Sequence, residues 1–210
     1  MGLPQSIPYY TVEQYLDLER SGEERHEYLD GSIYAMAGES LQHSRICTNL
    51  ARVVSTQLIG RSCEALSPNM KVRSGATIKQ KRRQSVMFSY ADLVVVCGEP
   101  RFHDKNRDVL LNPSVIVEVL SPSTEAFDRG EKFLRYRTWI DTLTDYVMVS
   151  QTMPLIEHYS RREDGWLLTA ASELSGTILI PSIDCQLRLS EVYDRVEFPP
   201  VDEGEAESEN

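Results

Sequence analysis

Residues 112–124 read Asn-Pro-Ser-Val-Ile-Val-Glu-Val-Leu-Ser-Pro-Ser-Thr, and the apolar run 115–120 inside this stretch decides the fold. A second run, Leu-Val-Val-Val-Cys, occupies residues 93–97. Both runs are continuous in β-branched residues rather than alternating, which is typical of strands covered on both faces. The two runs therefore predict the centre of a sheet with further structure packed on each side.

Helices and shorter strands are predicted on either side of these runs. Thr11 and Gln14 form a capping box that opens a helix to about Arg20. Asp30-Gly31 predicts a hairpin turn, and Ser40 begins a helix that runs to about residue 59. Residues 74–89 are expected to form a loop. Strands are also predicted near 63–66, 69–73, 146–149, 156–159, 166–170 and 177–180, and helices over 124–139 and 189–193.

This order of elements predicts an α/β fold with a mixed sheet, flanking helices and a C-terminal β meander. Residues 1–198 are expected to form one domain, and residues 199–210 an acidic disordered tail. No window approaches the roughly 20 unbroken apolar residues of a spanning helix, which argues against a transmembrane protein.

The charge is distributed unevenly along the chain. The formal net charge is −10, and the last ten residues carry five acidic and no basic side chains. In contrast, residues 71–83 contain six basic and no acidic side chains: Lys71, Arg73, Lys79, Lys81, Arg82 and Arg83. Because binding depends on where the charge lies, an acidic chain can still bind nucleic acid. These six side chains are candidate phosphate contacts, which Arg101, Lys105 and Arg107 would extend; the alternative is a solvated basic loop.

Four scattered cysteines form no CxxC pair and show no zinc-ligand spacing. Cys47 and Cys97 lie inside apolar runs, where cysteine is expected to be a small buried hydrophobe. The first residues lack the pattern of a signal peptide. We therefore expect a reducing, cytoplasmic location.

Two carboxylates stand in apolar surroundings. Asp92 directly precedes the run 93–97, and Glu118 lies in the middle of the run 115–120. Burying an unpaired carboxylate costs several kcal/mol, so Glu118 must be protonated, ion-paired or bound to a metal. The structural alternatives are a buried Glu–Arg pair for Glu118 and a simple turn for Asp92.

A lysine follows on the next helix. Residues 128–131, Asp-Arg-Gly-Glu, have the spacing of a capping box, although Ser123 or Thr124 could begin the helix earlier. In either case Lys132 lies near the start of the helix, beside the end of the strand that carries Glu118. Two carboxylates can hold Mg²⁺, which polarises a phosphoryl oxygen and activates water. A nearby ammonium can orient that water or stabilise negative charge. The combination predicts phosphodiester hydrolysis, with an ordinary solvated helix charge as the alternative for Lys132.

Three segments carry a family resemblance: Ser-Tyr-Ala-Asp-Leu-Val-Val-Val at 89–96, the stretch 112–124, and Asp-Arg-Gly-Glu-Lys-Phe at 128–133. They closely resemble the Uma-two family of nucleases, which have a restriction-endonuclease-like PD-(D/E)xK core. With Glu-Tyr-Leu-Asp-Gly at 27–31 and the helix of His43, the resemblance spans about residues 11–193. It implies a restriction-endonuclease-like core, a Mg²⁺ or Mn²⁺ cofactor, a DNA substrate and a homodimer.

The resemblance also implies roles for residues. Asp92 and Glu118 would hold the metal, although Ala91 stands where the superfamily pattern has proline. Leu120 replaces the lysine expected two positions after the glutamate, and Lys132 is expected to take its role. Glu27 and His43 are expected to assist near the cleft. Judged from the residues alone, Glu27 reads as a solvated residue before a strand and His43 as part of a core-facing stripe.

The sequence is compatible with three functions. The first is a cytoplasmic endodeoxyribonuclease that needs Mg²⁺ or Mn²⁺, binds DNA and no membrane, and pairs as a homodimer. The second is a non-catalytic module that keeps the nuclease fold and binds nucleic acid or protein, which the acidic balance and the absent strand lysine favour. The third is a hydrolase of a small phosphorylated molecule, for which the chain offers no Gly-rich phosphate cradle.

Overall fold

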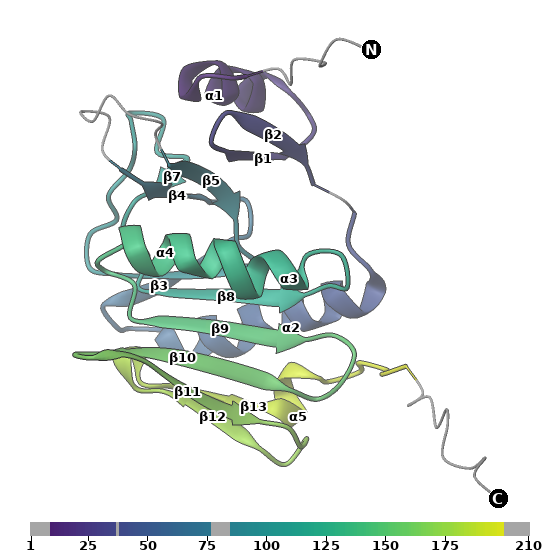
Figure 1. Cartoon of the computed structure of the whole chain (residues 1–210). Coiled ribbons are helices and arrows are strands. Elements are labelled where there is room, and N and C mark those ends of the chain that lie inside the picture. The colour runs from purple at the N-terminus through teal and green to yellow at the C-terminus, as the bar shows by residue number, and fades with distance from the viewer. Residues whose placement is uncertain (1–8, 37, 77–84, 200–210) are drawn as a thin grey trace, which may run out of the picture.

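A six-stranded mixed sheet crosses the middle of the molecule in the order β11-β10-β9-β8-β6-β3 (Figure 1). The computed structural model describes residues 9–36, 38–76 and 85–199. Only β8 and β9 run parallel in this sheet; its other neighbours are antiparallel. The central runs are confirmed as β6 and β8. The strands are β3 (Cys63–Leu66), β6 (Leu93–Cys97), β8 (Val115–Leu120), β9 (Asp145–Ser150), β10 (Ile156–Arg162) and β11 (Gly165–Ala171).

Both faces of this sheet are covered, as the continuous apolar runs predict. Helix α2 (Leu41–Leu58) packs its apolar stripe against one face, where Val117 and Val119 of β8 point. Helix α4 (Phe133–Trp139) covers the other face, where Ile116 and Leu120 point. Because side chains alternate along a strand, Glu118 belongs to the face that α4 covers. Figure 1 shows the sheet between these two helices.

A second, five-stranded sheet lies beside the first in the order β2-β1-β5-β4-β7. Helix α1 (Val12–Ser21) has the predicted capping box, and its Tyr15 packs against Tyr28 and Phe88 of this sheet. The predicted hairpin turn is confirmed, with positive φ at both of its central residues. The strands are β1 (His26–Leu29), β2 (Ser32–Ala35), β4 (Lys71–Gly75), β5 (Val86–Tyr90) and β7 (Val109–Leu110).

Strand β5 corrects the expectation of a loop over 74–89. It is fully buried because it pairs with β1 on one side and with β4 on the other. Apolar and polar residues alternate only weakly in its sequence, so the strand becomes evident only from its pairing with distant strands. Residues 77–84, which contain Lys79, Lys81, Arg82 and Arg83, lie outside the described residues.

The helix after β8 is one continuous run made of three pieces: α3 (Glu125–Phe127), a π-helical turn (Asp128–Lys132) and α4. The predicted helix is confirmed, and of its two possible starts the structure has the earlier one, at Thr124, and not the capping box at Asp128. The helix begins at Thr124, so Asp128 lies inside it and is buried. The π turn buries both Asp128 and Lys132 beneath the helix.

The C-terminal part continues with strands, as expected. β10 and β11 form a hairpin around Asp164-Gly165, and β12 (Thr177–Ile180) then pairs with β13 (Cys185–Arg188) in a separate two-stranded sheet. The predicted last helix is α5 (Leu189–Val192). Residues 200–210, most of the expected tail, lie outside the described residues.

Cys97 is not the free buried hydrophobe that its apolar run predicts. It is partly exposed and forms a disulfide with Cys63 on the neighbouring strand. Antiparallel pairing places these two residues directly opposite each other.

Within the part of the chain that the structure describes, no helix is long and apolar enough to cross a membrane.

Candidate metal and catalytic site

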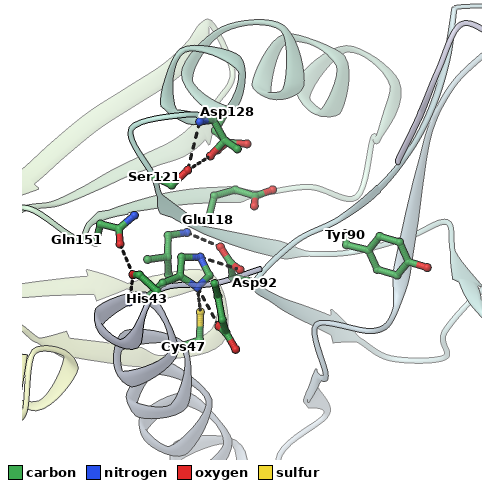
Figure 2. A network of polar contacts seen from close by, with 12 residues as sticks. His43, Cys47, Tyr90, Asp92, Glu118, Ser121, Asp128 and Gln151 are labelled. Atoms are coloured by element: carbon green, nitrogen blue, oxygen red, sulfur yellow. Dashed lines mark hydrogen bonds and ion pairs between the residues drawn. The ribbon is translucent and has the colours of Figure 1, made fainter. Parts of the chain in front are cut away.

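Asp92 and Glu118 meet across the pairing of β6 and β8. Leu93 is opposite Val117 in this antiparallel register, so Asp92, one residue earlier, is opposite Glu118, one residue later. The Oδ2 atom of Asp92 accepts a hydrogen bond of 2.7 Å from the backbone N–H of Val119. The sheet register thus places the two predicted carboxylates side by side (Figure 2).

Glu118 is buried, with 3% of its surface exposed. Its Oε1 atom lies 3.0 Å from the Lys132 ammonium but has no partner with hydrogen-bond geometry. A buried carboxylate oxygen that lacks a donor carries a desolvation cost that a bound cation would offset. In this structure the cation nearest to that oxygen is the Lys132 ammonium.

Lys132 lies in the same interior and is 4% exposed. Besides Glu118, its Nζ atom lies 3.3 Å from Asp128 Oδ1 and 3.5 Å from Glu27 Oε1. It also donates a hydrogen bond of 3.3 Å to the carbonyl of Tyr90. The lysine from the helix thus reaches the face of β8 on which Leu120 lies, and it is not a solvated helix charge.

Glu27 and Asp128 complete the surroundings of Lys132. Glu27 accepts a hydrogen bond of 3.1 Å from the backbone N–H of Tyr90, which holds β1 against the end of β5. The interpretation of Glu27 as a solvated residue is therefore wrong. Asp128 reaches Lys132 from one turn earlier on the same helix. Both carboxylates hold the ammonium in place.

His43 reaches the site from the opposite face, at the N-terminus of α2. Its Nε2 atom lies 3.4 Å from Asp92 Oδ1, and its Nδ1 atom lies 3.1 Å from Glu39 Oε2. The N-cap residue of α2, Ser40, bonds to Gln151 just after β9, which holds the helix end against the sheet (Figure 2). His43 thus faces a carboxylate of the site instead of filling the apolar core.

The negative charge of the site exceeds its positive charge, and this sets the protonation states. Burial raises the pKa of Glu118, and the nearby Asp128 and Asp92 add to this against the effect of Lys132. Burial alone would lower the pKa of Lys132, but Glu118 and the other carboxylates raise it well above its usual value. Glu118 and Lys132 therefore both keep their protons to a higher pH than usual, and the surplus of carboxylates favours additional positive charge in the site.

Asp92 and His43 behave as a pair. Burial alone would raise the pKa of Asp92, but the hydrogen bond and charge of His43, with the Val119 amide, keep it below its ordinary value. Burial alone would lower the pKa of His43, but Asp92 and Glu39 raise it to about 9. At neutral pH, Asp92 is therefore an anion beside an imidazolium.

A family comparison identifies the chain. The sequence profile of the Uma2 (Uma-two) family, whose description is "Putative restriction endonuclease", matches residues 12–190. The chain belongs to the Uma2 family. The Asp92, Glu118 and Lys132 side chains come from the segments on which the resemblance rests. Membership supports a nuclease-like function.

The chain is also similar to two cyanobacterial proteins and to one solved structure. Two uncharacterized proteins of the cyanobacterium Synechocystis are 35% and 34% identical, covering 91% and 76% of this chain and 95% and 85% of theirs. A crystal structure of a putative nuclease of DUF820 from Anabaena variabilis has a TM-score of 0.68 at 16% identity, covering 88% of this chain and 97% of the other. This structure shows that the fold is shared.

Two basic residues predicted to contact nucleic acid face the protein instead. Lys71 is 5% exposed, and its Nζ atom lies 3.2 Å from Asp108 Oδ2. Arg73 donates a hydrogen bond of 2.8 Å to the carbonyl of Ala76. Both lie on β4, a strand of the five-stranded sheet whose partners enclose it, so the assignment of Lys71 and Arg73 to a phosphate-binding surface is corrected.

Sequence reasoning misses Asp128, Glu39 and Cys47 of this Uma2 protein as neighbours of the site. The pattern at Asp128 indicates a helix cap, although its i, i+4 spacing to Lys132 is visible in the sequence. Glu39, His43 and Cys47 repeat at the same spacing: Glu39 lies just before the N-cap Ser40, and His43 and Cys47 lie on one side of the first turns of α2. This four-residue spacing is the sequence signal that could have placed Glu39 and Cys47 beside His43.

Proposed function

We propose that this Uma2 protein is an endodeoxyribonuclease that uses Mg²⁺ or Mn²⁺ to hydrolyse DNA phosphodiester bonds. The observation that carries the proposal is the Lys132 ammonium, which is buried 3.0 Å from Glu118 although the strand itself has leucine in place of a lysine. A carboxylate pair with an adjacent cation is the arrangement that metal-assisted hydrolysis requires. Lys132 supplies the cation from the helix.

The residues present fit such a metal. Asp92 and Glu118 offer carboxylate oxygens, which are the ligands that Mg²⁺ and Mn²⁺ prefer. The Oε1 atom of Glu118 is buried and lacks a hydrogen-bond donor, so a cation would satisfy it. When bound, the metal would polarise the phosphoryl oxygen and lower the pKa of a coordinated water.

The remaining side chains have separate tasks in this proposal. Lys132 keeps its proton, so it acts as a cation that orients the attacking water and faces developing negative charge, and it does not act as the base. Glu27 and Asp128 hold the ammonium in position. His43 donates Nε2–H towards Asp92 and keeps that carboxylate ionised.

The metal dependence can be tested with Glu118→Gln, which keeps the shape of the side chain and removes its charge. We expect the wild type to bind Mn²⁺ in calorimetry and to nick supercoiled plasmid with Mg²⁺ or Mn²⁺, but not with a chelator. Glu118→Gln should lose both properties. Glu64→Gln, on the exposed side of β3, is the matched control and should keep both.

The outcomes separate the competing functions. Cleavage by Glu118→Gln at the wild-type rate would contradict the proposed site. Metal and DNA binding without cleavage by the wild type would favour the non-catalytic module, which Leu120 and the acidic balance support as an alternative. The homodimer remains a prediction, which light scattering of the purified chain would test.

DNA contact is proposed for the basic residues Lys79, Lys81, Arg82 and Arg83, with the exposed Arg101, Lys105 and Arg107 as an extension. Neutralising the first four should weaken binding uniformly across DNA sequences and reduce the salt slope by about 0.9 for each lost phosphate contact. Neutralising the exposed Arg188 and Arg195 is the control and should leave the slope unchanged. An unchanged slope in the fourfold variant would identify a solvated loop.

A further inference from the structure

Glu39, His43 and Cys47 bring three different ligand types together beside the nuclease site. They follow one another at intervals of four residues across the start of α2, and one ligand atom from each lies within 4.8 Å of the others. The Nδ1 atom of His43 lies 3.1 Å from Glu39 Oε2 and 3.4 Å from Cys47 Sγ. Figure 2 shows the Cys47 thiol beside the His43 imidazole.

These separations match those between ligands that share one zinc ion. Bonds of about 2.0–2.1 Å to nitrogen and oxygen and about 2.3 Å to sulfur, in tetrahedral geometry, separate the ligand atoms by roughly 3.3–3.6 Å. The two distances from His43 Nδ1, 3.1 Å to Glu39 Oε2 and 3.4 Å to Cys47 Sγ, are within a few tenths of an ångström of these values. The third pair, Glu39 and Cys47, lies within 4.8 Å, so small side-chain adjustments complete the geometry.

The second nitrogen of His43 supports the same conclusion. Its Nε2 atom lies 3.4 Å from Asp92 Oδ1, so Nε2–H faces a carboxylate and Nδ1 faces the cluster. Histidines that bind metal through one nitrogen almost always donate the other N–H to a carboxylate, a carbonyl or water. Asp92 has this role here.

We propose that Glu39, His43 and Cys47 form a second metal site, which takes a thiophilic divalent cation of the Zn²⁺ class. Carboxylate oxygen, imidazole nitrogen and thiolate sulfur suit zinc, whereas the all-oxygen pair Asp92 and Glu118 suits Mg²⁺ or Mn²⁺. Binding forms three bonds to the ion and releases the Cys47 thiol proton and the Nδ1 proton of His43. Three protein ligands leave a fourth position open for water or substrate.

The position of the cluster suits ion exchange with solvent. The Glu39 side chain is 54% exposed and His43 is 16% exposed, so an ion reaches the site from the Glu39 side. Among the residues that the structure describes, this is the one set of three or more His, Cys, Asp or Glu ligands with such spacing. The other free thiol in the described part of the chain, Cys185, is buried against β12 and the carbonyl of Ile183.

The experiment uses the full chain with saturating Mg²⁺ and no added thiol, titrated with Zn²⁺ against a chromophoric chelator and, separately, with Co²⁺. We expect one Zn²⁺ per chain, and a Co²⁺ complex with a thiolate-to-metal charge-transfer band. Cys47→Ser should abolish that band and weaken Zn²⁺ binding at least about 100-fold, and Glu39→Gln about 10-fold or more. Circular dichroism confirms that each variant is folded.

Three control variants test whether Zn²⁺ binds at Cys47 and not at another group. Cys185→Ser and the double variant Cys63→Ser/Cys97→Ser should bind Zn²⁺ as the wild type does. Glu118→Gln should also keep the Zn²⁺ site, so the site can be present even if the proposed nuclease function fails. Equal Zn²⁺ affinity in Cys47→Ser and the wild type, or a Co²⁺ complex without a thiolate band, would overturn the proposal.

Discussion

At the scale of single residues, the stability of the protein and the proposed cleavage both depend on one buried carboxylate and the lysine that faces it. Glu118 stands in a strand whose residues are all buried, where an unpaired charge costs several kcal/mol. Lys132 offsets part of this cost, and Glu27 and Asp128 offset the cost of burying the lysine. The four groups are therefore coupled, and removal of one changes the others.

This coupling means that loss of Lys132 affects stability as well as cleavage. Lys132→Met removes the cation and leaves three carboxylates close together with no counter-charge. We expect the free energy of unfolding to fall by about 3–5 kcal/mol, measured by urea denaturation without divalent metal. Plasmid nicking should also be lost.

The matched control is Lys105→Met, because Lys105 is exposed. It should change the free energy of unfolding by no more than about 0.5 kcal/mol. Adding Glu118→Gln to Lys132→Met should restore part of the lost stability, because one of the unpaired charges is gone. Wild-type stability in the single variant would show that the carboxylates are not coupled to Lys132.

At the scale of elements, the π-helical turn over residues 128–132 positions the lysine. Asp128 and Lys132 are the first and last residues of this turn, and both are buried beneath the helix. π turns of this kind often occur at functional sites. Gly130 occupies the exposed side of the turn, and a Cβ atom built there has no neighbour within 4 Å.

Gly130→Ala should therefore stabilise the protein by about 0.5–1 kcal/mol, because alanine loses less backbone entropy than glycine in a helix. The measurement is urea denaturation. Gly31→Ala provides the contrast: Gly31 has a φ of +101°, and its Cβ would clash with the Tyr9 ring, so this variant should be less stable. A loss of stability in Gly130→Ala would mean that the turn requires glycine.

At the scale of the whole molecule, charged pairs join the two sheets and their helices. Arg135 of α4 binds both carboxylate oxygens of Asp30, at 3.1 and 2.6 Å, and thus ties the helix to the β1–β2 turn. Arg20 of α1 binds Asp104 and Asp108, and Asp108 also faces Lys71 of β4. The Arg135–Asp30 pair thus holds the small sheet, which carries Glu27, against the site, and the pairs around Asp108 link α1 and the 104–108 loop to β4 within the small sheet.

Asp108 makes this assembly sensitive to acid. The hydrogen bond from Arg20 and the charge of Lys71 lower the pKa of Asp108 to about 2, below the value near 3.9 of an unfolded chain. Because the folded pKa is lower, the stabilisation is present above about pH 4 and is lost as the pH falls through 2. Asp108→Asn should cost about 1–2 kcal/mol at pH 7 and flatten the decline between pH 4 and 2.

Urea midpoints measured from pH 7 to pH 2 check this prediction. Asp164→Asn, in the exposed turn between β10 and β11, is the control and should follow the wild-type profile. Parallel profiles for Asp108→Asn and the wild type would show that the link between α1 and β4 does not contribute to acid stability.

Much of the fold was predictable from local patterns. The β-branched runs of β6 and β8, the capping box of α1 and the Asp30-Gly31 turn depend on neighbours within a few residues, so the sequence reveals them directly. The position of a glutamate in an apolar strand likewise identifies Glu118 as unusual before its partner is known.

Only the tertiary structure decided which side chains meet. Strand β5 exists because it pairs with both β1 and β4. Lys71 is buried because its side chain contacts Tyr90 of β5 and Asp108, which lies just before β7. Glu27 reaches Lys132, far away in the sequence, only because the two sheets pack together. Caps, turns and strand runs are decided by short-range sterics and hydrogen bonds, whereas these contacts depend on the packing of distant elements, which no local pattern contains.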